Sequence, residues 1–252
     1  MKVIFTGAGP GDPELLTVKA RRLLESCEFC IYAGSLVAPE VIGLIPETAD
    51  KYDSAKLNLD EIMALIEQAR DRSVDVIRLH TGDPSIYGAI GEQMARLDAL
   101  GIEFEVVPGV SSFQAAAAAL RTELTAPNGS QTITLTRIAG RTPVPDNQDL
   151  AALAETGATL CIFLSVQKIS DVAAKLIPHY GDDCPACVVY RASWPDQLVI
   201  RSTLAGIHEE VQAAGIKKTA MTLVGAALAK CTTESLLYAA SFSHEYRKGN
   251  TT

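Results

Sequence analysis

The chain has 252 residues, 48% of them hydrophobic, which is enough for one large domain or two small ones with a full-sized core. Its formal net charge of −8 excludes a generic attraction for nucleic acid, so an anionic ligand would need a local group of basic side chains. The sequence has no apolar run of about 18 residues, as a membrane span requires, and its first apolar stretch is too short for a signal peptide. We therefore expect a cytoplasmic protein that binds neither nucleic acid nor a membrane.

The first half of the chain alternates short apolar runs with amphipathic segments. The apolar runs predict strands at residues 2–6, 29–34, 74–80 and 103–108. The amphipathic segments predict helices at residues 14–26, 39–45, 58–72, 89–101 and 111–120. Asn58 or Asp60 is a suitable N-cap for the third helix, and Gly101 a suitable stop for the fourth. This alternation with short glycine turns favours a mainly parallel sheet.

The second half has a different pattern, in which hairpin-like pairs of strands mix with helices. Strands are expected at residues 131–138 and 159–165, on both sides of a turn at 194–196, within 218–228, and at 234–242. Helices are expected at residues 149–156 and 166–180 and after the second strand of the hairpin. The sequence thus predicts an α/β protein of two α/β domains, at residues 1–120 and 121–240, the second with a mixed sheet. Residues 241–252 are expected to form a polar tail.

Six cysteines are scattered along the chain, and two pairs have the C-x-x-C spacing found in zinc and redox sites, at 27 and 30 and at 184 and 187. Both pairs lie at the ends of expected strands, and the chain has only 4 histidines. Buried, unreactive thiols are therefore the favoured interpretation, and we predict no metal site.

The loop GAGPGD at 7–12 follows an expected strand and resembles the dinucleotide fingerprint G-x-G-x-x-G. Asp12 replaces the third glycine, and Tyr32 lies where an acidic residue is expected about 20 positions further on. A dinucleotide site is therefore disfavoured. The loop still offers backbone N–H groups and little bulk to a ligand, although a tight turn would use the same glycines.

Two further loops follow expected strands in the same half. HTGDPSIYG at 80–88 contains Gly82, which permits a backbone conformation closed to other residues, and Asp83, which is either a ligand group or a helix cap. In VPGVSS at 107–112, Ser111 and Ser112 open the next helix and are either N-caps or ligand-binding groups. Three such turns at strand ends indicate a ligand site at the carboxyl edge of the sheet.

The succession GAGPGDPELLT, RLHTGDPSIYG and VPGVSS resembles the tetrapyrrole methyltransferase family, which are S-adenosyl-L-methionine-dependent enzymes of the class III fold. The segments YAGSLV at 32–37, TRIAGRTPVP at 136–145 and YRASWPDQ at 190–197 resemble one branch of it. That branch methylates carbon 11 of precorrin-4, or of its cobalt form, in vitamin B12 synthesis. The resemblance covers about residues 1–230.

This resemblance implies two α/β domains with S-adenosyl-L-methionine in the cleft between them, the tetrapyrrole beside it, and usually a homodimer. S-adenosyl-L-homocysteine would be the product. Position by position, it implies that the cofactor is bound by Pro10, Gly82, Asp83, Ile86, Ser111, Ser112, Leu164, Ala192 and Thr222. Leu164 departs from many relatives, which have methionine there; leucine keeps the volume and loses only the thioether.

Methyl transfer from a sulfonium needs alignment and the exclusion of water, and it needs no acid because the leaving group is neutral. A base would remove a proton from the substrate, and the candidates in these loops are Asp83, Asp12, Tyr87 and His80. The substrate's carboxylates are expected to bind Arg137, Arg141 and Arg191, unless these arginines form internal ion pairs. Trp194 either stacks on the macrocycle or fills the turn in which it lies.

Three other hypotheses remain open. A sibling enzyme would methylate another position of the macrocycle, a nicotinamide-dependent oxidoreductase would bind NAD, and a silent binding module would hold the cofactor without methyl transfer. Protection from unfolding by S-adenosyl-L-homocysteine, and turnover of each precorrin, discriminate among them.

Overall fold

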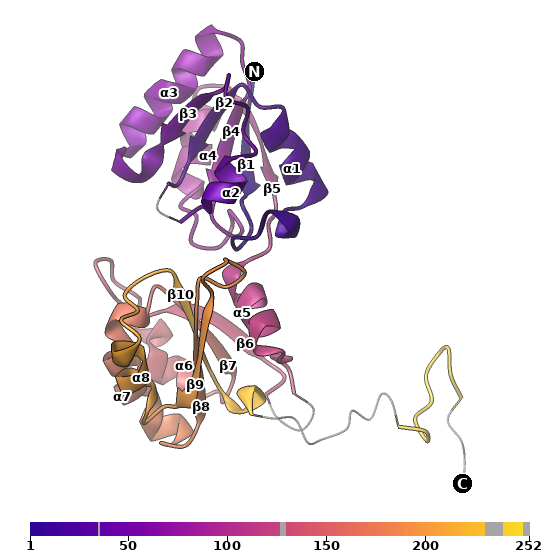
Figure 1. Cartoon of the computed structure of the whole chain (residues 1–252), viewed down its shortest axis with the longest axis vertical. Coiled ribbons are helices and arrows are strands. Elements are labelled where there is room, and N and C mark those ends of the chain that lie inside the picture. The colour runs from indigo at the N-terminus through magenta and orange to yellow at the C-terminus, as the bar shows by residue number, and fades with distance from the viewer. Residues whose placement is uncertain (35, 127–129, 230–238, 249–252) are drawn as a thin grey trace. The chain divides into compact units, whose positions relative to one another are not determined.

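The computed structural model describes residues 1–34, 36–126, 130–229 and 239–248. Their contacts divide the chain into two compact units: Met1–Ala116 with Arg191–Leu198, and Ala117–Tyr190 with Val199–Thr252. We call these unit 1 and unit 2 and describe each by itself (Figure 1). Each contains a sheet and helices, which confirms the predicted α/β class.

Unit 1 is built on a five-stranded sheet in the order β3-β2-β4-β1-β5, with every neighbouring pair parallel. Its strands are β1 (Lys2–Gly7), β2 (Phe29–Tyr32), β3 (Asp50–Asp53), β4 (Val76–His80) and β5 (Glu103–Val107). Because all the strands run in one direction, their carboxyl ends lie at one edge of the sheet. The ends of β4, β1 and β5 are neighbours at that edge.

Helices cover both faces of this sheet, because successive side chains of a buried strand point to opposite sides (Figure 1). Phe5 packs in one core cluster with Ile66 and Leu97, while Ile4 packs in another with Leu24. The helices are α1 (Val18–Glu25), α2 (Pro39–Ile42), α3 (Leu59–Asp71) and α4 (Gly91–Ala99). Helices α3 and α4 supply the first cluster, and α1 and α2 the second.

Local signals account for the start of α3 and the end of α4. The Asn58 side chain accepts from the backbone N–H of Glu61, and the Glu61 side chain accepts from that of Asn58, so a capping box starts α3. Gly101, at φ +63°, follows α4 as expected. Strand β3 is not among the predicted elements. Its four residues, DKYD, carry three charges and no apolar run, and it forms the outer edge of the sheet.

Unit 2 contains the mixed sheet that the sequence predicts, in the order β6-β7-β10-β8-β9. Its strands are β6 (Ile133–Arg137), β7 (Thr159–Phe163), β8 (Pro185–Tyr190), β9 (Leu198–Thr203) and β10 (Ala220–Val224). Strands β6 and β7 are parallel, and β10 is antiparallel to both β7 and β8. The carboxyl ends of β6, β7 and β8 therefore lie at the same edge as the start of β10.

One face of this sheet is covered by helices whose apolar side chains share a core cluster with it. Leu160 and Ile162 of β7 pack in that cluster with Leu150, Leu176 and Val211. These three come from α6 (Leu150–Ala154), α7 (Ile169–Tyr180) and α8 (Ile207–Ala213). The expected strand at 234–242 lies mostly outside the described residues, as does the end of the expected tail. Within the described ranges, no helix is long and apolar enough to cross a membrane.

The largest difference between these units and the sequence-based division is one segment of the chain. Residues Arg191–Leu198 join β8 to β9 of unit 2, yet their contacts assign them to unit 1. The physical reason is Trp194, whose indole N–H donates to the Pro10 carbonyl and whose ring packs on the second core cluster of unit 1. The helix α5 (Ser112–Leu120) carries the chain from unit 1 into unit 2, with the division after Ala116.

Candidate functional site

Three loops of unit 1 meet at the carboxyl edge of its sheet. They follow β1, β4 and β5, which are neighbours, and each contributes a glycine: Gly7, Gly82 and Gly109. A β-carbon at Gly7 would lie 2.6 Å from Cα of Gly109, and one at Gly109 would lie 2.9 Å from Cα of Gly7. Either β-carbon would also overlap the carbonyl oxygen of Gly82. The backbones of the three loops therefore approach one another as closely as only glycine allows.

Backbone hydrogen bonds hold the first two loops together. Gly82 N–H donates to the carbonyl of Gly9 at 2.9 Å, and Gly9 N–H donates back to the carbonyl of Gly82 at 3.3 Å. Ala8 N–H donates to the carbonyl of His80 at 2.7 Å. Gly9 and Gly82 both have positive φ, of +65° and +63°, so the bridge needs glycine at both positions.

Asp83 joins the second loop to the third. Its carboxylate accepts hydrogen bonds from Gly109 N–H at 2.9 Å, from Ser85 N–H at 2.8 Å, and from the Ser85 hydroxyl. Burial acts to raise the pKa of Asp83, but these hydrogen bonds from Ser85 and Gly109 together outweigh it and lower the pKa below its usual value. Asp83 is therefore an anion whose two oxygens are both engaged within the protein, an arrangement that suits a positioning group better than a base.

The other predicted residues of these loops are close in sequence to the three glycines. Pro10 is buried, and Asp12 caps the short 3₁₀ helix Pro13–Leu15 by accepting from Glu14 N–H. Ile86 is half-buried, and Tyr87 is 48% exposed with a positive φ of 54°. The third loop supplies buried Ser111 and half-buried Ser112.

A buried polar network lies under the second loop, and sequence reasoning missed it. Arg78 is only 5% exposed; its guanidinium donates to Gln93 Oε1 at 3.1 Å and to the carbonyl of Ile31 at 3.2 Å. Gln93 Nε2 donates in turn to the carbonyl of Ala89, a residue held at φ 50°. Burial lowers the pKa of Arg78 to about 10. The sequence did carry a signal, because Arg78 lies within an apolar run and a buried arginine is almost always paired.

His80 is buried in the same region. Burial, with a smaller contribution from Arg78, lowers the pKa of His80 to about 3, so the ring is neutral at physiological pH. Its Nε2 has no hydrogen-bond partner among the described residues, and its ring lies 5.9 Å from that of Phe5. His80 ends β4 beneath the second loop. At 5% exposure it is too deeply buried to act as a base that reaches the substrate.

In unit 2, several predicted residues share one edge of the mixed sheet. Arg137 ends β6 opposite Phe163 of β7, so Leu164 follows at the same edge. Leu164 is 71% exposed and has a positive φ of 53°, a strained backbone for a large apolar residue. Thr222 lies in β10 opposite Ile162, and it is fully buried. Its hydroxyl pairs with that of Ser165 at 3.0 Å.

The three predicted substrate arginines differ in what they bind. Arg137 donates to the carbonyls of Thr142 and Pro143, so it braces the loop that follows β6. Arg191 forms an ion pair with Asp196, and Ala192 beside it is buried. Arg141 is exposed in the loop after β6 and makes no hydrogen bond or ion pair with any other described residue. Arg141 is thus the candidate with its guanidinium available to a ligand.

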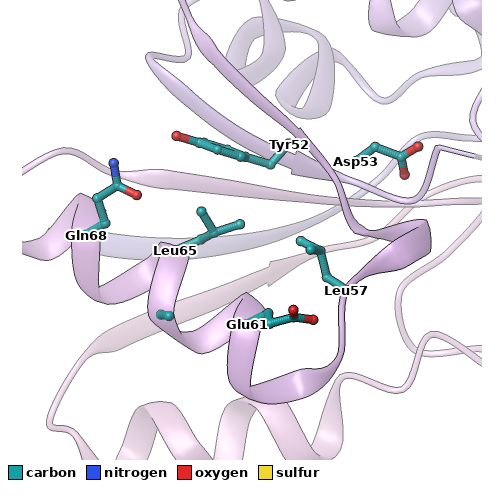
Figure 2. Close-up of a pocket in the computed structure, with 7 residues that line it drawn as sticks. Tyr52, Asp53, Leu57, Glu61, Leu65 and Gln68 are labelled. Carbon is teal, nitrogen blue, oxygen red and sulfur yellow. The ribbon is translucent and has the colours of Figure 1, made fainter.

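A groove of about 360 Å³ lies elsewhere in unit 1, between the edge strand β3 and α3 (Figure 2). Tyr52 and Asp53 approach it from the strand, and Leu65 from the helix. The remaining lining residues are Leu57, Glu61, Ala64 and Gln68. None of the residues predicted to bind the cofactor or the substrate lines it.

The described cysteines are buried free thiols. Burial raises the pKa of Cys161 to about 12, and it also raises the pKa of Cys184 and Cys187. A hydrogen bond between the thiols of Cys27 and Cys30 lowers the pKa of Cys27 and raises that of Cys30. Among the described residues, no three histidine, cysteine or acidic side chains come together as a metal site would require.

The family model of the tetrapyrrole (corrin/porphyrin) methylases matches residues 2–208. This chain belongs to that family. The predicted resemblance is confirmed, and with it the expectation of a methyltransferase. Membership leaves the nicotinamide hypothesis without support.

Relatives of this methylase are similar over nearly their whole length. The precorrin-4 C(11)-methyltransferase of Pseudomonas aeruginosa is 48% identical over 250 residues, covering 99% of this chain and 100% of the relative. The cobalt-precorrin-4 C(11)-methyltransferase of Methanocaldococcus jannaschii is 48% identical, covering 99% of this chain and 97% of the relative.

A solved structure of a cobalt precorrin-4 methyltransferase has a TM-score of 0.88 at 41% identity, covering 91% of this chain and 96% of that one. A uroporphyrin-III C-methyltransferase from Thermus thermophilus, complexed with S-adenosyl homocysteine, has a TM-score of 0.78 at 30% identity, covering 90% of this chain and 99% of that one.

Proposed function

We propose that this methylase transfers a methyl group from S-adenosyl-L-methionine to carbon 11 of precorrin-4 or of cobalt-precorrin-4. The observation that carries the proposal is the meeting of three loops at Gly7, Gly82 and Gly109, together with full-length relatives named for this reaction. Both forms of the substrate remain in the proposal, because relatives named for each are equally similar at 48% identity.

The carboxyl edge of unit 1 fits the cofactor chemically. Glycines give a ligand access to backbone N–H and carbonyl groups without side-chain bulk. Beside Gly82, the hydroxyl of Thr81 is buried and has no hydrogen-bond partner among the described residues. An unpaired buried hydroxyl of this kind suits a ligand that carries polar groups of its own. Pro10, Ile86, Ser111 and Ser112 would complete the seat.

When bound, S-adenosyl-L-methionine supplies a methyl group on a cationic sulfonium, and the leaving thioether is neutral. The protein therefore has to hold the attacking carbon in line and exclude water. No covalent enzyme nucleophile is needed. The anionic Asp83 adds an attraction for the sulfonium through space, while its main task is to fix the distance between the second and third loops.

Unit 2 would supply the remaining contacts. Leu164, exposed at the strand end, offers an apolar side chain to the cofactor, and buried Thr222 acts by holding Ser165 in place. Ala192 would contribute its small side chain from the turn after β8, a segment that belongs to unit 1. We assign the substrate's carboxylates to Arg141, with Arg137 bracing the loop that presents it.

The proposal is tested with methyl-¹³C-labelled S-adenosyl-L-methionine. Purified protein is incubated with precorrin-4, cobalt-precorrin-4 and uroporphyrinogen III, and the products are read by mass spectrometry and carbon NMR. We expect one methyl added per macrocycle, at carbon 11, from one or both precorrins. A product labelled only on uroporphyrinogen III would favour a sibling activity, which a 34% identical relative from Methanosarcina barkeri carries in its name. No labelled product from any macrocycle would overturn the proposal.

The role of Asp83 is tested by two substitutions. Asp83→Asn keeps one acceptor oxygen and sets an amide N–H₂ against either Gly109 N–H or Ser85 N–H, whereas Asp83→Ala removes both acceptors. A positioning role predicts weaker binding of S-adenosyl-L-homocysteine in both variants, by about tenfold, equivalent to about 1.4 kcal/mol. If calorimetry gave unchanged affinity while kcat collapsed in both variants, Asp83 would instead be the base, ahead of Asp12 and Tyr87.

The expected homodimer and the expected cytoplasmic location are part of the proposal. Sedimentation equilibrium at several protein concentrations tests the first, and a mass of about 27 kDa at all of them contradicts it. Fractionation of cells that express the chain tests the second.

A further inference from the structure

We infer that the turn Arg191–Gln197 is a clamp that sets the conformation of the first glycine loop for cofactor binding, with Trp194 as its main positioning residue. The inference rests on the proposed function, because it requires that loop 7–12 seats S-adenosyl-L-methionine. It assigns the indole of Trp194 to the protein's own loop and not to the macrocycle.

The clamp contacts the loop at three consecutive residues. The indole N–H of Trp194 donates to the carbonyl of Pro10 at 2.8 Å. Asp12 N–H donates to the hydroxyl of Ser193 at 3.1 Å. Between them, a β-carbon on Gly11 would overlap Cδ1 and Nε1 of the indole, so the ring lies directly against the backbone of Gly11.

These contacts satisfy backbone groups that a tight loop cannot pair internally. The carbonyl of Pro10 and the N–H of Asp12 flank Gly11, and a glycine-rich loop is otherwise free to adopt several backbone conformations. Each of these hydrogen bonds stabilises one backbone conformation of the loop over the others. The cofactor then meets a loop whose conformational entropy has already been reduced, which increases affinity.

The turn is itself held by contacts among its own residues. The Arg191 guanidinium lies 4.8 Å from the Trp194 ring centroid and forms an ion pair with Asp196. Ser193 N–H donates to the side-chain oxygen of Gln197 at 2.8 Å. Arg191 and Ser193 have positive φ, of 44° and 71°. Two non-glycine residues with positive φ cost free energy that the surrounding contacts must offset. Such strained residues are common in segments that form functional sites.

The same contacts decide the role of Arg191. Its guanidinium is engaged by Asp196 and by the Trp194 ring, so it orients the indole that in turn orients Pro10. We therefore assign Arg191 to the clamp and not to the substrate's carboxylates.

The first experiment uses the fluorescence of the whole chain, since Trp194 is its single tryptophan. S-adenosyl-L-homocysteine is titrated into the protein, and Trp194 emission is recorded beside the heat of binding. We expect the emission to change with the same half-saturation as the heat. Because the ligand is proposed to lie on the loop that Trp194 contacts, emission that stays constant while calorimetry shows binding would place the ligand elsewhere and overturn the clamp. Absence of any heat would instead count against the proposed function.

The second experiment compares three variants. Trp194→Phe keeps an aromatic ring and removes the donor to Pro10, and Ser193→Ala removes the acceptor for Asp12 N–H. Tyr52→Phe, in the groove of Figure 2, also removes one polar group from an aromatic ring of unit 1 and serves as the control. We expect Trp194→Phe to bind S-adenosyl-L-homocysteine about tenfold more weakly and Ser193→Ala about threefold. The control is expected to bind as the unmodified protein does.

Affinities are measured well below each variant's unfolding midpoint, with circular dichroism to verify the fold. Unchanged affinity in Ser193→Ala and Trp194→Phe overturns the inference. If Trp194→Phe does not fold, unchanged affinity in Ser193→Ala alone overturns it. A raised KM for S-adenosyl-L-methionine in the Trp194→Phe variant, with kcat within about twofold, supports a positioning role.

Discussion

The residues predicted to bind ligands are held in different ways in the two units. In unit 1, a parallel sheet brings three loops to one edge, and the loops meet through the backbones of Gly7, Gly82 and Gly109. In unit 2, a mixed sheet leaves side chains at the corresponding strand ends, among them exposed Leu164 and the brace Arg137. Backbone approach tolerates no added atom, whereas exposed side chains tolerate replacement. The difference predicts that substitutions at the close approach of the loops in unit 1 alter folding and cofactor binding together, while those of exposed side chains in unit 2 alter binding alone.

The largest effect is expected from Gly109→Ala. The new β-carbon would overlap the carbonyl of Gly82 and lie 2.9 Å from Cα of Gly7, so two backbones must shift. We expect the free energy of unfolding to fall by about 3 kcal/mol and S-adenosyl-L-homocysteine binding to be lost. Urea unfolding and calorimetry measure the two effects.

The matched control is Gly91→Ala at the start of α4, where nothing lies within 4 Å of the added carbon. It should leave binding unchanged and stabilise the helix slightly. If Gly109→Ala bound the ligand with unchanged affinity, the close approach of the loops would have no part in the site.

A second prediction concerns pH and the buried floor of unit 1. Burial and Arg78 hold the pKa of His80 at about 3, below its ordinary 6.5. Between these values the unfolded chain binds a proton that folded His80 does not, so this contribution to stability is present above about pH 6.5 and is lost as the pH falls. The slope reaches at most about 1.4 kcal/mol per pH unit.

His80→Phe should remove that slope, because a phenyl ring can keep the contact with Phe5 and cannot titrate. Urea unfolding of both proteins at pH values of about 7, 6 and 5 measures the difference. Parallel pH profiles for the two proteins would show that folded His80 takes up its proton in the ordinary range.

The third prediction tests a buried pair of unit 2. Thr222→Val keeps the shape of the side chain but removes the hydroxyl that pairs with Ser165. We expect a loss of about 1–2 kcal/mol of stability, with affinity for S-adenosyl-L-homocysteine changed by less than about threefold, because Thr222 is fully buried. A double-mutant cycle with Ser165→Ala isolates the pair. A large loss of affinity with unchanged stability would mean that Thr222 contacts the cofactor directly.

The sequence predicts the parts of this architecture that have local signals. An apolar run followed by a glycine turn predicts both a strand and a ligand loop, and this is how the edges of β1, β4 and β5 are found. The contact of Trp194 with Pro10 joins residues 184 positions apart, and no periodicity reports such a contact. The burial of Arg78 was missed for a related reason. Its acceptor Gln93 lies on α4, and the apolar pattern of a strand does not report which helix packs against it. Strand β3 was missed because an edge strand needs no apolar run.

The smallest effect on folding is expected at Arg141, which is exposed in the loop after β6 of unit 2. Arg141→Gln removes a charge that has no partner among the described residues, so unfolding should change by less than about 0.5 kcal/mol. If Arg141 binds a carboxylate of the macrocycle, KM for the tetrapyrrole should rise about tenfold while that for S-adenosyl-L-methionine stays constant. Arg70→Gln, an equal change of charge at an exposed position on α3, controls for long-range attraction of an anionic substrate. Equal KM values in the two variants would remove Arg141 from the site and leave the recognition of the carboxylates to groups that the sequence does not single out.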